Sequence, residues 1–140
     1  MSGDRAWSHF RHQADVGICG EGATPEQAFA NAAIAMTAVI TAPQRVRPEQ
    51  PVSLHCTAPD LELLLVDFLN AIVYEMATRH MLFSRFDLSI RDGRLDAIAW
   101  GEALDPQRHQ PAVEVKGASY TELEVSHENG HWTARCVVDV

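Results

Sequence analysis

Residues 58–76 have the sequence APDLELLLVDFLNAIVYEM, and this pattern sets the fold class of the 140-residue chain. The Pro-Asp pair is typical of a helix start, and the apolar residues that follow recur at helical spacing. The members of this apolar face are Leu61, Leu64, Leu65, Phe68, Leu69, Ile72 and Met76, widened by Leu63, Val66 and Tyr74. A helix with so wide an apolar face is expected to pack against a sheet.

A second helix is predicted upstream, over about residues 25–41. Thr24-Pro25-Glu26-Gln27 forms a capping box with proline at the first helical position. Apolar side chains then return every three or four residues, as one face of a helix requires. They are Phe29, Ala32, Ala33, Met36, Val39 and Ile40.

The rest of the chain has strand character. Two short strands, 7–12 and 16–21, are expected to meet at Gln13 to Gly17, and a third covers 52–57. Five more are expected at roughly 84–91, 95–104, 112–118, 120–127 and 131–139, separated by turn signals such as Asp92-Gly93. Strands joined by tight hairpins predict an α+β fold: antiparallel β-sheets with two packed α-helices, in a single domain over 1–140. Residues 1–6 are expected to be flexible.

Composition narrows the function classes. Eleven Lys and Arg stand against nineteen Asp and Glu, a net charge of −8, and Lys116 is the sole lysine. This acidic balance argues against a protein that binds a phosphate backbone by itself; a cation or a basic partner surface suits the chain better. No apolar run suits a membrane span and no secretory signal is visible, so a cytoplasmic protein is expected. Three distant cysteines predict reduced thiols.

A cation site is plausible at the two ends of the chain. His12 and Asp15 lie in the bend between the first two strands, and Asp139 is followed by Val140 with its α-carboxylate. Paired oxygen donors of this kind favour Ca²⁺, Mg²⁺ or Mn²⁺. The competing explanations are an ordinary Asx-turn at Asp15 and a frayed, solvated tail at Asp139.

Two further places could carry function. Residues 101–109 bring Glu102, Arg108 and His109 to a strand end and turn, where His109 could be a general base or, more simply, a surface contact. Lys116 follows the alternating stretch 113–115, where an exposed lysine most often protects a sheet edge. No common catalytic signature, such as GxSxG, HExxH or a phosphate-binding GxxxxGK loop, is present.

Taken in order, these motifs resemble the archease family over residues 7–140. The matching elements are His12-x-Ala-Asp15-x-Gly17, Asp67-Phe68-Leu69-Asn70, Gly101-Glu102-x-x-Asp105-x-x-Arg108-His109, Val115-Lys116, Tyr120 and the final Asp139-Val140. The family more often has threonine, alanine and histidine at the positions of Gln13, Gly117 and Thr121, and the missing histidine beside Tyr120 is expected to alter the partner surface or the RNA task.

The resemblance implies a protein cofactor, not an enzyme. Archeases assist the RtcB-type RNA ligase of tRNA splicing and RNA repair, promoting guanylylation of its active-site histidine and multiple turnover, so RNA is expected to be contacted only through the ligase. The resemblance also implies a divalent metal, expected to be calcium, held by Asp15, Asp139 and Val140, with Lys116 as a further functional residue. Two alternatives stay open: a chaperone-like modulator of RNA-modifying enzymes such as a tRNA methyltransferase, and a metal-dependent phosphatase or nuclease. The oligomeric state is not predicted.

Overall fold

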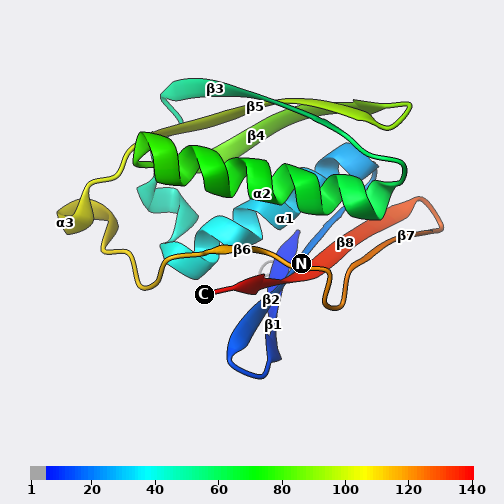
Figure 1. The fold of residues 1–140 in the computed structure, drawn as a ribbon, viewed down its shortest axis with the longest axis horizontal. Helices are drawn as coiled ribbons and strands as arrows, with labels where there is room; N and C mark the ends of the chain where they lie inside the picture. Colours follow the sequence, from blue (N-terminus) through cyan, green and yellow to red (C-terminus); the bar gives the residue numbers. More distant parts are fainter. Residues whose placement is uncertain (1–5) are drawn as a thin grey trace.

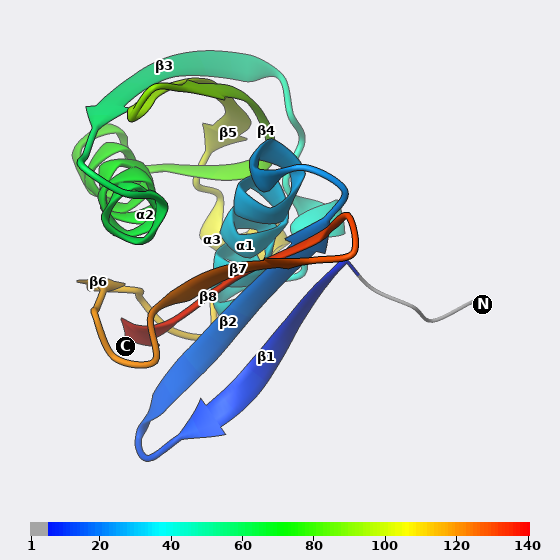
Figure 2. The ribbon, with the colours of Figure 1, turned by 90° about the vertical axis from the view of Figure 1, so that its right-hand side faces the viewer.

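The structure, a computed structural model that describes residues 6–140, contains two antiparallel sheets with two long helices between them (Figures 1 and 2). Helix α1 spans Pro25–Ile40 and helix α2 spans Leu61–Arg79. The predicted α+β class is therefore confirmed. The expectation of a flexible start falls mainly on residues 1–5, which lie outside the described part of the chain.

The first sheet gathers the two ends of the described chain. Its strands are β1 (Trp7–His12), β2 (Asp15–Gly22), β8 (His131–Asp139) and β6 (Gly117–Ala118), in that order, and β7 (Glu124–Glu128) also pairs with β8. Because β8 pairs with β2, the last strand lies in the middle of the sheet beside one of the first.

The second sheet holds the middle of the chain. Strands β3 (Gln50–Thr57), β5 (Arg94–Ala103) and β4 (Met81–Arg91) pair in that order, all antiparallel. Strand β4 follows α2 almost at once, because His80 ends the helix in the left-handed region at φ 55°. A short 3-10 turn, η1 (Pro43–Arg45), precedes β3.

One predicted strand is largely wrong. Residues 112–118 form only the two-residue strand β6, and a short helix, α3 (Pro106–His109), precedes them. The Asp105 side chain caps α3 by accepting from the Gln107 and Arg108 N–H groups, at 3.1 and 3.3 Å. Gln110 then takes a positive φ, and Pro111 has no N–H to offer a ladder, so extended pairing starts late.

Both long helices begin where their caps predict. Thr24 accepts a hydrogen bond from the Gln27 N–H at 3.1 Å, and Asp60 accepts from the Leu63 N–H at 2.8 Å. The core between the sheets is apolar, and its largest fully buried side chains include Phe29, Phe68 and Phe83. No helix among residues 6–140 is long and apolar enough to span a membrane.

Glycine at position 20 lets α1 approach the first sheet. A Cβ there would lie 2.2 Å from both the Ala28 carbonyl oxygen and the Ala32 nitrogen, so no side chain fits. This contact brings α1 against β2 and fixes the strand that carries Asp15.

Candidate functional site

The β1–β2 hairpin places His12 directly opposite Asp15. The two residues are cross-strand partners around a two-residue turn at Gln13 and Ala14, and Gln13 takes the left-handed conformation at φ 53°. Partners opposite each other in an antiparallel pair share one face of the sheet. The predicted bend is confirmed, but the turn lies before Gly17, which sits inside β2 under the Phe10 ring.

Strand β8 brings Asp139 to the same end of the sheet. Its register with β2 runs from Gly22 opposite Trp132 to Val16 opposite Val138. The pairing ends at Val16 and Val138, and Asp15 and Asp139 follow one residue further along on each strand. Asp15 is half-buried and Asp139 is exposed. The two aspartates, one from each end of the chain, therefore lie beside each other.

Val140 and Lys116 complete this group. The half-buried Val140 packs against the core. The Lys116 N–H donates to the Asp139 carbonyl oxygen at 2.8 Å, and the next residue, Gly117, is the β6 partner of Asp139. The side chain of Lys116 is exposed. We call His12, Asp15, Lys116, Asp139 and Val140 the strand-end site.

The donors of the strand-end site fit a hard cation only in part. Among residues 6–140, no group of three or more His, Cys, Asp or Glu side chains is arranged to hold a metal ion. The two neighbouring aspartates offer carboxylate oxygens, so a cation there would also need oxygen atoms of Val140 and water. Beside them, the buried Nδ1 of His12 has no hydrogen-bond partner among residues 6–140. Such an orphaned atom marks a site able to take a further ligand or water.

Asn70 is a positioning residue that the sequence analysis assigned no task. From α2, its Oδ1 accepts the Ala118 N–H at 2.8 Å and its Nδ2 donates to the Ala118 carbonyl at 3.3 Å. These two bonds tie β6, and with it Lys116, to the helix. The available signal was a polar side chain interrupting the apolar run 61–76.

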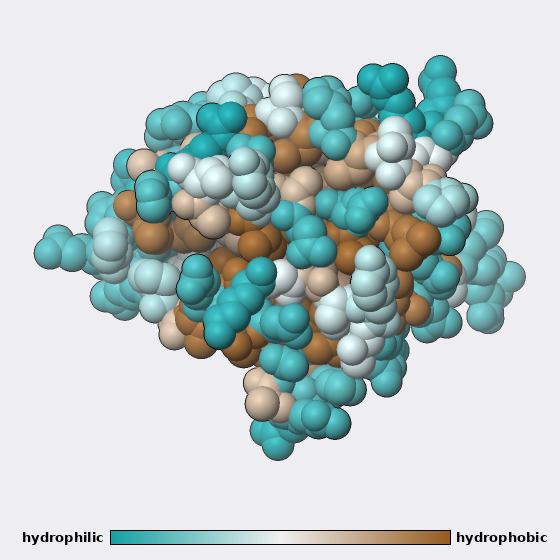
Figure 3. All heavy atoms as spheres, viewed as in Figure 1, coloured by the Kyte–Doolittle hydropathy of each residue, from teal (hydrophilic) through white to brown (hydrophobic). Residues whose placement is uncertain are grey.

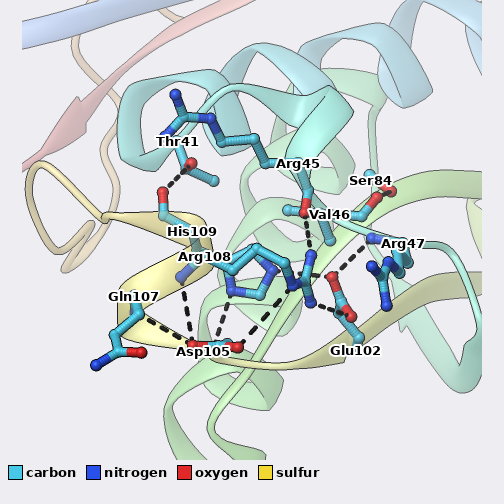
Figure 4. A network of polar contacts seen from close by, with 10 residues as sticks. All are labelled: Thr41, Arg45, Val46, Arg47, Ser84, Glu102, Asp105, Gln107, Arg108 and His109. Carbon is cyan, nitrogen blue, oxygen red and sulfur yellow. Dashed lines mark hydrogen bonds and ion pairs between the residues drawn. The ribbon is translucent and has the colours of Figure 1, made fainter.

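Glu102, Arg108 and His109 form a separate cluster at the end of β5 (Figure 4). The Glu102 carboxylate, 6% exposed, contacts the Arg108 Nη2 at 2.5 Å, accepts from the Arg47 N–H at 2.8 Å and lies 2.9 Å from the His109 Nε2. Arg108 also donates to the Arg45 carbonyl at 2.7 Å. No hydrogen bond or ion pair within residues 6–140 joins this cluster to the strand-end site.

The expectation of His109 as a surface contact is wrong, because its side chain is fully buried. Its Nδ1 accepts the Asp105 N–H at 2.9 Å, so the ring proton must sit on Nε2, which donates to Glu102. Both ring nitrogens are thus used, and His109 has no free lone pair for general-base work. Glu102 and His109 connect α3 to the sheet.

The lowered pKa of Glu102 is consistent with a role in holding α3 to the sheet. Burial raises its pKa, but the hydrogen bonds from Arg108, Arg47 and His109 outweigh this effect and lower the pKa to about 2. The carboxylate therefore stays charged at all physiological pH values, with every contact satisfied.

An apolar pocket of about 520 Å³ opens beside the segment that leads to Lys116. Its walls come from the second half of α2, the start of β4 and residues 104–115, and include Met76, Met81 and Val115. Figure 3 shows apolar surface between hydrophilic side chains across this side of the molecule. The pocket thus borders the strand-end site through the chain that carries Lys116.

Comparison with known proteins gives a consistent result. The model of the archease protein family matches residues 7–140. A protein archease of Pyrococcus furiosus is 34% identical over 141 residues, covering 97% of this chain and 99% of that protein. One from Methanopyrus kandleri is 36% identical over 138 residues, covering 96% and 99%.

Solved structures share the fold. The solution structure of Methanobacterium thermoautotrophicum protein 1598 superposes with a TM-score of 0.84 at 30% identity, covering 96% of this chain and 99% of that one. An archease of Thermotoga maritima, described as a possible chaperone, has a TM-score of 0.62 at 13% identity and covers 94% of each chain. At that identity the second likeness shows the fold alone.

Proposed function

The chain belongs to the archease family, and from this premise we propose that it is a protein cofactor that activates an RtcB-type RNA ligase in tRNA splicing or RNA repair. It promotes guanylylation of the ligase and multiple turnover and has no catalytic activity of its own. The observation that carries the proposal is the β2–β8 register, which ends one residue short of Asp15 and Asp139 and so brings them to the same end of the sheet, with the Lys116 N–H bonded to the Asp139 carbonyl. These are the residues that match the family's functional positions.

Asp15, Asp139 and Val140 are the residues that would hold the divalent cation, Ca²⁺ before Mg²⁺ or Mn²⁺. A cation bound there supplies fixed positive charge that can face phosphate oxygens. Two neighbouring carboxylates repel each other without a counterion, which favours uptake of a cation by the folded chain. His12, opposite Asp15, orients the carboxylate or a bound water.

The net negative charge of the chain and the exposed side chain of Lys116 both favour docking to the ligase. The net charge of −8 suits the basic, RNA-binding cleft of a ligase, and the exposed Lys116 would reach a nucleotide phosphate there as a compact, mobile charge. Electrostatic docking weakens as salt rises. If ligase activation stays constant between low and high salt, electrostatic docking is contradicted.

The decisive experiment is RNA ligation under multiple-turnover conditions by the cognate ligase, with and without this protein. We expect the wild type to sustain turnover and Asp139→Ala or Asp15→Ala to abolish the stimulation. Glu128→Ala, which removes an exposed carboxylate at the end of β7, is the matched control and should stimulate normally. Full stimulation by both aspartate variants would remove the strand-end site from the mechanism.

Metal binding can be tested without the ligase. Calcium titration calorimetry should give weaker binding for a chain extended beyond Val140 and unchanged binding for one with an N-terminal tag. Equal affinities in the two tagged forms would exclude Val140 as a ligand.

A chaperone-like modulator of RNA-modifying enzymes is the second candidate, favoured by the apolar pocket that Val115 lines next to Lys116. On that reading, suppression of methyltransferase aggregation should persist in Asp15→Ala and Asp139→Ala. A metal-dependent phosphatase or nuclease would instead show turnover by the isolated protein, for which we expect none.

A further inference from the structure

The second sheet has one face that none of the helices in residues 6–140 covers. Its inner face packs on α1 and α2, while the other face is open on the outside of the molecule (Figures 1 and 2). Side chains alternate along each strand, so the registers define which residues point outward. In rows across β4, β5 and β3 this outer face carries Arg85, Trp100 and Pro51; Asp87, Ile98 and Ser53; Ser89, Asp96 and His55; and Arg91, Arg94 and Thr57.

The outer face differs in charge from the molecule as a whole. It carries three arginines against two aspartates, a balance of +1, in a chain of net charge −8. The acidic residues are thus concentrated elsewhere, and the face can attract an anion that the rest of the surface repels.

Arg91 and Arg94 mark one end of the outer face. They lie directly opposite each other at the tip of the β4–β5 hairpin, whose turn residues Asp92 and Gly93 have φ of 52° and 76°. Like charges in this position destabilise a sheet, so the pair needs a counter-charge. Arg94 pairs with Asp96 at 3.1 Å, but the Arg91 side chain has no hydrogen bond or ion pair within residues 6–140.

A polar hollow receives these two guanidinium groups. It is lined by Ser89, Arg91, Asp92, Arg94 and Asp96. Two neighbouring guanidinium forks and a hydroxyl offer donors that a phosphate group accepts, beside the carboxylates of Asp92 and Asp96. The exposed Arg94–Asp96 pair is worth little by itself, so a phosphate can share Arg94 with the aspartate.

Trp100 marks the other end of the outer face. The Arg85 guanidinium carbon lies 5.4 Å from its ring centroid, and the indole N–H donates to Asp87 at 2.9 Å. Trp100 is half-buried under this guanidinium, and a planar guanidinium held over an aromatic ring is a surface on which nucleic-acid bases stack. Trp100 and Arg94 are roughly 20 Å apart along β5, enough for several nucleotides of a single strand.

We infer that the outer face of the second sheet binds single-stranded RNA, with a phosphate between Arg91 and Arg94 and a base on Trp100. This goes beyond the proposed cofactor function, because the face shares no residue with the strand-end site. It also revises the expectation of purely indirect RNA contact, since net charge averages over faces that the fold separates. In a ligation complex the outer face would hold the strand that leads to the end being joined.

The test is fluorescence anisotropy of a labelled oligouridine of about 12 nucleotides with the full chain alone at low salt. We expect salt-dependent binding that the double variant Arg91→Glu/Arg94→Glu weakens about tenfold or more, with the slope of log affinity against log salt falling by about 0.7 for the one phosphate contact that is lost. Trp100→Leu should weaken binding several-fold without changing that slope. Arg91→Gln/Arg94→Gln provides the same comparison without new acidic charge, should the reversal impair folding.

Arg79→Glu is the matched control. Arg79 is 54% exposed and paired with Glu75, as Arg94 is 66% exposed and paired with Asp96, but it lies on α2. A loss of affinity in this control equal to that in the double variant would overturn the proposal, as would absent binding by the wild type. Equal displacement of the RNA by poly-glutamate at the same charge concentration would also overturn it. Because no ligase is present, these outcomes are independent of the cofactor function.

Discussion

Replacing Glu102 by glutamine should cost the protein much of its stability. One carboxylate oxygen contacts the Arg108 guanidinium. The other oxygen accepts hydrogen bonds from the Arg47 N–H and the His109 Nε2. An amide has a single acceptor oxygen, so Glu102→Gln either leaves two buried donors without a partner or turns its NH₂ group toward the Arg108 guanidinium. Removing one partner from a buried charge network costs about 3–5 kcal/mol, a large fraction of the stability of a typical domain. Urea unfolding followed by circular dichroism measures this loss.

The same variant should change the response to acid. The pKa of Glu102 falls from 4.5 to about 2 on folding, so its contribution is fully present above pH 4.5. It is lost as the pH falls from about 4.5 to about 2, where the folded carboxylate takes up a proton. A shift of this size corresponds to at most about 3 kcal/mol. Unfolding free energies of the wild type should therefore drop more steeply over this window than those of Glu102→Gln.

Glu122→Gln is the control for both measurements. Glu122 also contacts an arginine, Arg135 at 2.7 Å, but its side chain is 47% exposed, and exposed pairs contribute about 0–1 kcal/mol. The reasoning fails if the two glutamine variants unfold at the same urea concentration and show the same acid profile.

Three further expectations concern single positions. Gly20→Ala should destabilise the fold by about 3 kcal/mol or more, since its Cβ would meet the α1 backbone at 2.2 Å; an unchanged melting temperature would contradict this. Asn70→Ala should lower the free energy of unfolding by about 1–3 kcal/mol and reduce ligase stimulation, because it removes both hydrogen bonds that hold Ala118. Normal stimulation by this variant would show that the position of β6 does not matter for activation. Burial raises the pKa of Cys136 to about 12, so a thiol reagent at pH 8 should modify it only after unfolding, and fast modification of the native protein would refute its burial.

Local sequence signals predicted the helices well. The caps at Thr24 and Asp60 and the apolar periodicity that follows each of them depend on neighbours a few residues away, and both helices begin where expected. The same local reasoning failed at residues 112–118, because strand alternation does not show whether a pairing partner is within reach. There Gln110 and Pro111 turn the chain, and only Gly117 and Ala118 pair with β8.

For the candidate site, too, some features follow from the sequence and others only from the tertiary structure. The sequence by itself determined which residues are chemically able to act, above all the two aspartates and the sole lysine. Only the tertiary structure decided that Asp15 and Asp139 lie at the same end of one sheet, that the His109 side chain is buried, and that three arginines share one face of the other sheet. The physical reason is that composition and spacing describe a chain in one dimension. Distances between side chains arise when hydrogen-bonded strands and a shared apolar core bring remote segments together.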